Sequence, residues 1–224
     1  MKLSVIILCL ITSNLYAYES KVEVSRKGDF KTFKAITSGE FEGSLEEVIE
    51  GIENFDEKCN NEKRSKRKFI KWETKCRFHN ENLVEAVKIF KPMEQKLKKY
   101  NGFQYLVWRN IYNSGKYSHY DVVTKNKIKE EVIITHEMLS VKEVKNIIDK
   151  PEKINSAFDN IRGTYKVSQM KNGKIKVDYI YESKTDHWFL TKDFLENKIK
   201  ENIISGTQQA LKTIELSLKE VRKQ

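Results

Sequence analysis

Hydrophobic residues recur at helical spacing along the last part of the chain, from Thr191 to Val221. They lie three or four positions apart, which places them on one face of a helix with 3.6 residues per turn. The stripe consists of Leu195, Ile199, Ile203, Gly206, Ala210, Ile214 and Leu218. Thr191 is an acceptable N-cap, and no proline interrupts the run. We therefore predict one amphipathic C-terminal helix about 45 Å long, a length that suits a broad curved sheet as its partner.

Most of the chain before this helix alternates apolar and polar residues, as half-buried β-strands do. The pattern predicts strands around residues 22–24 and at 33–41, 69–75, 103–112, 117–125, 128–139, 163–170 and 174–183. Residues 83–90 fit a strand or a helix, and we prefer a strand because Pro92 follows closely. The last two should form a hairpin, because Asn172-Gly173 is a typical turn sequence between alternating residues. In the strand at 103–112, alternation puts Tyr105, Val107, Arg109 and Ile111 on one side.

Two capping boxes predict short helices between the strands. Ser44 with Glu47 opens one, and Ser140 with Glu143 opens the other. Residues 154–162 read as a loop, and the chain shows no internal repeat or interdomain linker. We expect one domain.

The N-terminus has the pattern of a secretory signal peptide. Lys2 is followed by an apolar run from Leu3 to Ile11, and Ala17 provides a small residue at the expected cleavage position. The run is shorter than the roughly 20 apolar residues that cross a bilayer. We predict a signal peptide at residues 1–17, export to the periplasm or beyond, and a mature domain over residues 18–224.

Removal of the signal peptide leaves two cysteines, Cys59 and Cys76. An oxidising compartment favours a disulfide between them, closing a loop of about 17 residues and stabilising the fold by roughly 3 kcal/mol. Without a CxxC motif or a nearby histidine pair, they do not predict a zinc site.

The chain is basic, with 42 Lys and Arg against 32 Asp and Glu, a formal net charge of +10. This charge favours anionic partners such as phosphate groups or an acidic membrane surface, or it keeps an exported domain soluble, which we prefer. The charged run from Cys59 to Lys68 is either a phosphate-binding patch or, as we prefer, a solvated segment. Nucleic acid is not an expected partner.

Sequence motifs for catalysis do not assign a catalytic residue, metal or cofactor. The four histidines, His79, His119, His136 and His187, have no metal-ligand spacing, and we interpret them as surface or edge residues. There is no GxSxG motif and no P-loop. Asp121 and Glu137 are candidate paired acids, but carboxylates in strands usually face solvent.

Three stretches resemble the START-like helix-grip superfamily, also called the polyketide cyclase and lipid-transfer superfamily. The first comprises Ser25 to Gly28, Phe33 to Ser38 and Ser44 to Val48, similar to the opening strand pair and first helix of bacterial members. The second is Tyr117-Ser118-His119-Tyr120-Asp121-Val122-Val123, similar to the family's SDRDFV-like strand without its first Asp. The third is a hairpin formed by Arg162 to Val167, Asn172 to Lys174 and Val177 to Tyr179, with Tyr165 where Trp is usual.

This resemblance implies an α+β fold in which a curved antiparallel sheet grips the C-terminal helix, with a cavity for an apolar ligand between them. The residues placed at that cavity are Tyr105, Val107, Val177, Tyr179, Trp188, Leu195, Ile199, Ile203, Gly206 and Ala210. Trp188 and Phe189 either gate the cavity or, as we prefer, anchor the helix to the sheet. Small Gly206 and Ala210 leave room for a ligand or for close approach of the sheet. Residues 59–101 fit the family poorly.

Three classes of function are compatible with these features. The first is a monomeric, noncatalytic binder of a lipid or other apolar molecule, which we favour. The second is a cyclase or hydrolase on the same fold, which would need a convergent polar set in the cavity. The third is a basic protein that interacts with the cell envelope or a membrane surface.

Overall fold

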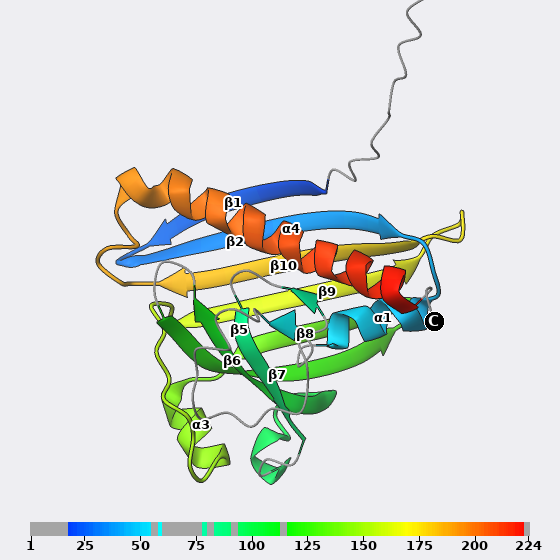
Figure 1. Cartoon of the computed structure of the whole chain (residues 1–224). Helices are drawn as coiled ribbons and strands as arrows, with labels where there is room; N and C mark the ends of the chain where they lie inside the picture. The colour runs from blue at the N-terminus through cyan, green and yellow to red at the C-terminus, as the bar shows by residue number, and fades with distance from the viewer. Residues whose placement is uncertain are drawn as a thin grey trace, which may run out of the picture.

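An eight-stranded antiparallel sheet curls around the long C-terminal helix in the computed structural model (Figure 1). The structure describes residues 18–54, 58–59, 78–79, 83–90, 94–112 and 116–221. The strand order is β1-β2-β10-β9-β8-β7-β6-β5. These strands are β1 (Glu19–Lys27), β2 (Phe30–Phe41), β5 (Leu83–Ile89), β6 (Phe103–Tyr112), β7 (Lys116–Ile128), β8 (Glu131–Met138), β9 (Asn160–Gln169) and β10 (Ile175–Thr185).

Helices and one small sheet complete the described part of the chain. They are α1 (Leu45–Glu53), α3 (Val141–Ile147), α4 (Glu196–Val221), the 3₁₀ helices η1 (Glu94–Leu97) and η2 (Asp193–Leu195), and the parallel pair of β3 (Lys58–Cys59) and β4 (Phe78–His79). None of the helices in the described ranges is long and apolar enough to cross a membrane.

Both predicted capping boxes are confirmed. The Ser44 hydroxyl accepts from the Glu47 amide, and the Glu47 carboxylate accepts from the Ser44 amide, at the start of α1. Ser140 and Glu143 repeat the arrangement at α3. Burial opposes ionisation of Glu143, but hydrogen bonds from Lys99 and Ser140 lower its pKa to about 2. Local sequence chemistry therefore fixes where both short helices begin.

The chain enters α4 later than the helical pattern predicts. The amides of Thr191 and Lys192 donate to the carbonyls of His187 and Phe189, which makes a turn before η2. Arg26 also donates to the Thr191 carbonyl at 2.6 Å. The α-helix then begins at Glu196, so the predicted N-cap Thr191 lies in the turn. Likewise, part of the predicted loop at 154–162 is strand, because β9 begins at Asn160 and pairs with β10.

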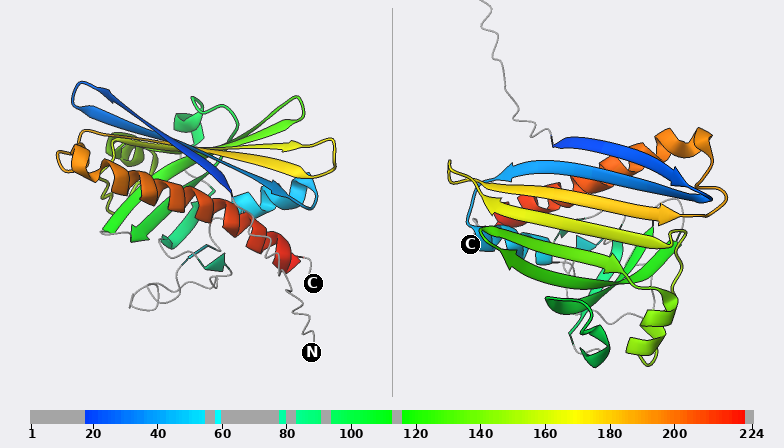
Figure 2. Two further views of the ribbon diagram at one scale, coloured as in Figure 1. Left: turned by 90° about the horizontal axis from the view of Figure 1, so that it is seen from above. Right: turned by 180° about the vertical axis from the view of Figure 1, so that it is seen from behind.

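The two faces of the sheet carry separate apolar cores, and α4 lies along one of these faces (Figure 2). The concave face, towards α4 and α1, buries Phe41, Val48, Ile52, Tyr105, Val107, Val123, Ile134, Tyr165, Val167, Val177, Tyr179, Leu211, Ile214 and Leu218, among others. The convex face packs against α3 and η1 and buries Leu97, Leu106, Trp108, Tyr120, Val122, Leu139, Val144 and Ile147. Alternation along β6 and β7 assigns neighbouring residues to opposite cores.

Helix α4 buries its C-terminal half more deeply than its N-terminal half. The fully buried apolar positions are Leu211 and Ile214, followed by Leu218 at 5% exposure. A Cβ added at Gly39 on β2 would lie 3.2 Å from a Leu211 methyl, so this glycine allows the helix to approach the sheet closely. Gly206, which the predicted stripe turned towards the sheet, is exposed, and an added Cβ would meet nothing within 4 Å.

Several predictions concern residues outside the described ranges. The signal peptide at 1–17 and the strand at 69–75 lie there entirely. Cys76 lies there too, although Cys59 belongs to β3. Export and the Cys59–Cys76 disulfide therefore stay predictions.

Candidate functional site

Polar side chains that are buried or, for Arg109, half-buried gather at one end of the concave face. We call this the polar end; it contains Lys31, Arg109, His119, Asp121, His136 and Ser183. The opposite, apolar end contains Phe41, Val132, Val167, Ile175 and Val177, covered by Leu211, Ile214 and Leu218 of α4 and by Val48 and Ile52 of α1. Strand register places His136 opposite Gly163 and Asp121 opposite Met138, while Ile175 pairs with Phe41 at the far end. Helix α4 starts at the polar end, where Lys31 contacts Glu196 at 3.0 Å.

The centre of the polar end is Asp121 on β7, which is fully buried. The Arg109 Nε atom on β6 lies 2.6 Å from Asp121 Oδ2. His119 Nε2 lies 3.3 Å from Oδ1, and His136 Nδ1 on β8 lies 3.5 Å from Oδ2. Three strands thus direct one guanidinium and two imidazoles at a single carboxylate. We call these four residues the Asp121 cluster.

Electrostatics keep Asp121 ionised despite its burial. Burial alone would raise the pKa of this carboxyl, but His119, Arg109 and His136 together hold it well below its ordinary value. Burial and the positive charge of Arg109 lower the pKa of His136, and the attraction of Asp121 only partly offsets them. At neutral pH the cluster therefore contains an ion pair between Arg109 and Asp121 beside a neutral His136.

A hydrogen bond extends the cluster towards the middle of the concave face. His136 Nε2 lies 3.1 Å from the Tyr179 hydroxyl. Because ionised Asp121 can only accept, the proton of neutral His136 belongs on Nδ1, which leaves Nε2 to accept from Tyr179. The Tyr179 ring stacks on Tyr165, with centroids 4.2 Å apart. Burial raises the pKa of Tyr165 to about 12 and that of Tyr179 well above its ordinary value.

Gly163 on β9 provides the space for this arrangement. A Cβ added there would lie 2.0 Å from His136 Nε2 and 2.7 Å from the Tyr179 hydroxyl. Any larger residue would displace the imidazole from its position between Asp121 and Tyr179. The glycine is therefore a requirement of the site.

Hydrogen bonding and charge pairing are the chemistry that this site offers most directly. Tyr179 and Tyr165 stay protonated, so they serve as hydrogen-bond donors and acceptors and not as bases. His119 Nδ1 is buried and has no hydrogen-bond partner among the described residues, although buried polar atoms usually have one. Within the described ranges, no group of three or more His, Cys, Asp or Glu side chains is arranged to hold a metal ion.

The residues predicted to line a ligand cavity have different environments. Tyr105, Val107, Val177 and Tyr179 are buried together in the concave core. On α4 and η2, Leu195, Ile199, Ile203 and Ala210 are half-buried, and Gly206 is exposed. Trp188 is 70% exposed and lies outside this group. Whether the others contact a ligand stays a prediction.

Trp188 and Phe189 do not anchor α4 to the sheet, which was our preferred interpretation. They are 70% and 45% exposed and contact each other, with ring centroids 5.6 Å apart. The turn between β10 and η2 is held by backbone hydrogen bonds and by Arg26, so it does not need an apolar anchor.

The Asp121 cluster was missed in the sequence. His119 and His136 are buried, which corrects their assignment as surface or edge residues. Asp121 does not pair with Glu137, because Glu137 faces the convex side and contacts Arg162 at 3.9 Å. Strand alternation was the signal that could have revealed the cluster. It puts Arg109 on the same side of β6 as Tyr105 and Val107, and Asp121 on the same side of β7 as Val123.

Comparisons with known proteins identify the fold. The crystal structure of human STARD10 superposes with a TM-score of 0.53 at 10% identity, over 89% of this chain and 73% of that one. The lipid transfer and protein localization domain of human StarD13 (DLC2) gives 0.47 at 9% identity, over 88% and 83%. CalU16 from Micromonospora echinospora gives 0.41 at 10% identity, over 90% and 84%. The likeness to STARD10 and the sheet curled around α4 show the START-like helix-grip fold. No protein-family model matches the sequence, and no curated protein matches it.

Proposed function

We propose that this protein binds a lipid or other largely apolar molecule on the concave face, with the ligand's polar group at the Asp121 cluster. The observation that carries the proposal is this buried charged cluster on a concave face whose core is mainly apolar. Buried charges that only stabilise a fold are readily replaced by apolar side chains, so their concentration at one end favours a binding role. In the same proposal the protein acts after export and without catalysis.

The half-buried apolar residues of α4 support a ligand that is mainly apolar. Ile199, Ile203 and Ala210 keep accessible surface on the part of the helix that begins at the polar end. Tyr181, on the adjacent strand β10, is also half-buried, and its pKa is raised mainly by desolvation. An apolar molecule bound against these side chains would remove their remaining surface from water, which is favourable.

The charge of the cluster favours an uncharged polar group on the ligand. Arg109 already pairs with Asp121, and Asp121 stays ionised. A carboxylate or phosphate at this point would lie next to a buried negative charge, where the low dielectric strengthens repulsion. A ligand hydroxyl could instead donate to the Tyr179 hydroxyl, whose own proton goes to His136, or bond to His119 Nδ1, without that cost. The ligand class is thus an apolar molecule with a neutral hydrogen-bonding group.

A matched pair of lipids tests this function. Diacylglycerol and phosphatidic acid with identical acyl chains would each be offered to the purified protein, and the complexes would be counted by native mass spectrometry. We expect a one-to-one complex with diacylglycerol and at least about tenfold weaker binding of phosphatidic acid, which corresponds to 1.4 kcal/mol. Equal binding of the two would contradict the role of the cluster, and binding of neither would contradict an apolar, lipid-like ligand.

The double substitution Arg109→Met with Asp121→Asn is the control for the cluster. It removes both charges together, so no unpaired charge is left in the interior. We expect the variant to stay folded and to lose the preference for diacylglycerol. The conservative change Glu137→Gln on the convex face should leave both binding and preference unchanged.

A further inference from the structure

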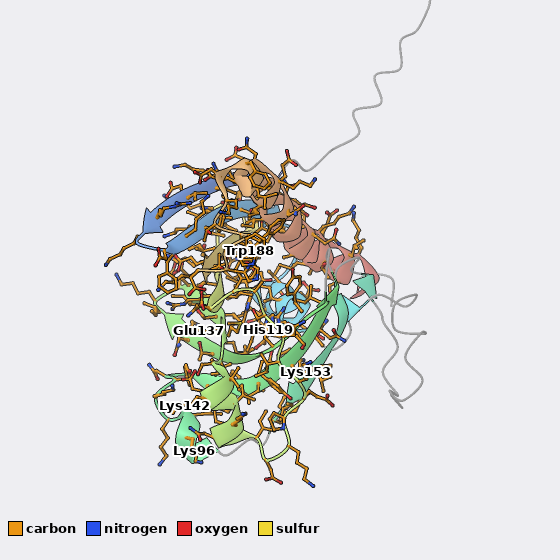
Figure 3. All side chains as sticks on the ribbon, turned by 90° about the vertical axis from the view of Figure 1, so that its left-hand side faces the viewer. Lys96, His119, Glu137, Lys142, Lys153 and Trp188 are labelled. Atoms are coloured by element: carbon orange, nitrogen blue, oxygen red, sulfur yellow. The ribbon has the colours of Figure 1, made fainter. Side chains whose placement is uncertain are left out.

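Three large aromatic side chains are exposed within seven residues, between the end of β10 and the start of α4. Trp188 is 70% exposed, Phe189 45% and Phe194 77%. Scattered exposed apolar residues are normal on soluble proteins, but three aromatics on one short segment form a patch. We call these three residues the aromatic tip. Figure 3 looks at this end of the molecule, with Trp188 and His119 labelled.

The segment that carries the aromatic tip is held in place by the body of the protein. Lys31 on β2 is 2% exposed and contacts both Asp193 and Glu196 at 3.0 Å. Arg26 on β1 contacts the Thr191 carbonyl at 2.6 Å and Asp193 at 3.1 Å. Backbone hydrogen bonds from Thr191 and Lys192 close the turn. The aromatic side chains are therefore displayed by an ordered turn that is tied to two strands.

The aromatic tip and the Asp121 cluster lie at the same end of the sheet. Trp188 follows the last residue of β10, Thr185, by three positions. Ser183 near that strand end pairs with Ile161, and His136 pairs with Gly163 two residues further along β9. Helix α4 also starts at this end, beside Lys31. Any surface that receives the aromatic tip would face the polar end of the concave face.

We infer that the aromatic tip inserts into the interfacial layer of a lipid bilayer. Tryptophan and phenylalanine side chains suit this layer, because their rings are apolar and the indole N–H still reaches water or headgroups. The formal net charge of +10 adds attraction to anionic headgroups. At the tip itself, Asp193 is matched by Arg26 and Lys31, and exposed Lys192 offsets exposed Asp186, so the local charges are close to balanced.

Vesicle sedimentation with matched variants tests the inference. The probes are phosphatidylcholine vesicles with and without about one third phosphatidylglycerol. The triple substitution Trp188→Ser, Phe189→Ser and Phe194→Ser removes the tip, while Ile128→Ser removes a side chain that is 57% exposed at the opposite end of β7. We expect wild type to bind both vesicles, more strongly with phosphatidylglycerol. The triple variant should lose at least about tenfold in partitioning on either vesicle, and Ile128→Ser should match wild type.

A conservative variant and a ligand-site variant complete the test. Trp188→Phe should keep most of the binding, because an aromatic ring remains. Arg109→Met with Asp121→Asn should bind vesicles as wild type does, so the docking result is independent of the proposed ligand site. Circular dichroism and thermal melting establish that every variant is folded.

Any one of four binding results would overturn the inference. The first is that wild type binds neither vesicle, and the second is that the folded triple variant binds as strongly as wild type. The third is that Ile128→Ser loses as much vesicle binding as the triple variant, and the fourth is that the Arg109→Met/Asp121→Asn variant also loses vesicle binding. Self-association of the lipid-free protein that disappears in the triple variant, without vesicle binding, would assign the tip to a protein interface and would also overturn it.

Discussion

The two ends of the concave face carry opposite chemistry. At the apolar end, Leu211, Ile214 and Leu218 of α4 pack on aliphatic side chains of the sheet and against α1. At the polar end, strands β6, β7 and β8 direct Arg109, His119 and His136 at Asp121. A fold needs the first kind of packing for its stability. The second kind costs desolvation, so its presence at one end indicates that the ends have different tasks.

The largest expected effect comes from breaking the charge pair of the polar end. Asp121→Asn leaves the Arg109 guanidinium without its anion in the interior, which should lower the free energy of unfolding by about 3–5 kcal/mol. Urea denaturation measures this, and Glu137→Gln is the matched acid-to-amide change on the convex face. Glu137→Gln should cost less than about 1 kcal/mol, because its contact with Arg162 is long and exposed. Equal losses of unfolding free energy at the two positions would show that the Asp121–Arg109 pair is no more important for stability than the exposed Glu137 contact.

Shortening one apolar side chain in each half of α4 should distinguish residues that stabilise the fold from residues that keep accessible surface. Leu211→Ala removes a fully buried side chain and should cost about 2–5 kcal/mol. Ile199→Ala removes a half-buried side chain, with an expected cost of about 1 kcal/mol or less. Thermal and urea unfolding provide both values. If Ile199→Ala proved as costly as Leu211→Ala, the N-terminal half would be a structural contact and not a ligand surface.

The pH dependence of stability should report on the polar end. The pKa of His136 is lower in the folded protein than its ordinary value of about 6.5, so the unfolded chain binds more protons as pH falls through that value. The contribution of His136 is therefore present at pH 7.5 and declines towards pH 5. Asp121, whose pKa is also lowered, contributes stability that declines only as pH falls below about 3.9.

The variant His136→Asn removes the contribution of His136 to the pH dependence of stability and leaves that of Asp121. Urea unfolding of wild type and variant at pH 7.5 and pH 5 should show a smaller loss of stability on acidification in the variant. An identical loss in both proteins would mean that His136 is not held neutral in the fold.

The smallest effect on stability is expected at Gly206. This position is exposed, and an added Cβ meets nothing within 4 Å, so Gly206→Leu should keep the melting temperature or raise it slightly. If the ligand lies beside this part of α4, the same variant should bind diacylglycerol more weakly. A substantial fall in melting temperature would instead show that the space beside Gly206 is filled.

Much of the fold could be predicted from the sequence because its signals are local. The Ser44 and Ser140 capping boxes, the Asn172-Gly173 hairpin and the alternation in β6 each act within a few residues. The inward face of α4 was harder to predict, because small polar residues occupy part of it. Thr207 is 2% exposed and its hydroxyl accepts from Thr37 on β2 at 2.7 Å, a contact across 170 positions. Hydrophobicity alone cannot reveal such a bond.

The candidate site depended on contacts between strands that are distant in sequence. Arg109, His119, Asp121 and His136 are each unremarkable alone, and a carboxylate in a strand usually faces solvent. The available signal was strand alternation, which puts these residues on the same side of their strands as the buried apolar residues. These residues come together only in the register of β6, β7, β8 and β9. The need for glycine at position 163 is evident only in the structure, where the His136 ring occupies the space that a Cβ would take.

The most direct test of the account uses the histidine side chains as site-specific probes. Imidazole ¹H–¹⁵N spectra of the protein would be recorded during titration with diacylglycerol, with resonances assigned by substitution. We expect the resonances of His119 and His136 to shift with saturation. Saturable binding that leaves His119 and His136 unmoved would contradict the claim that the ligand's polar group lies at the Asp121 cluster.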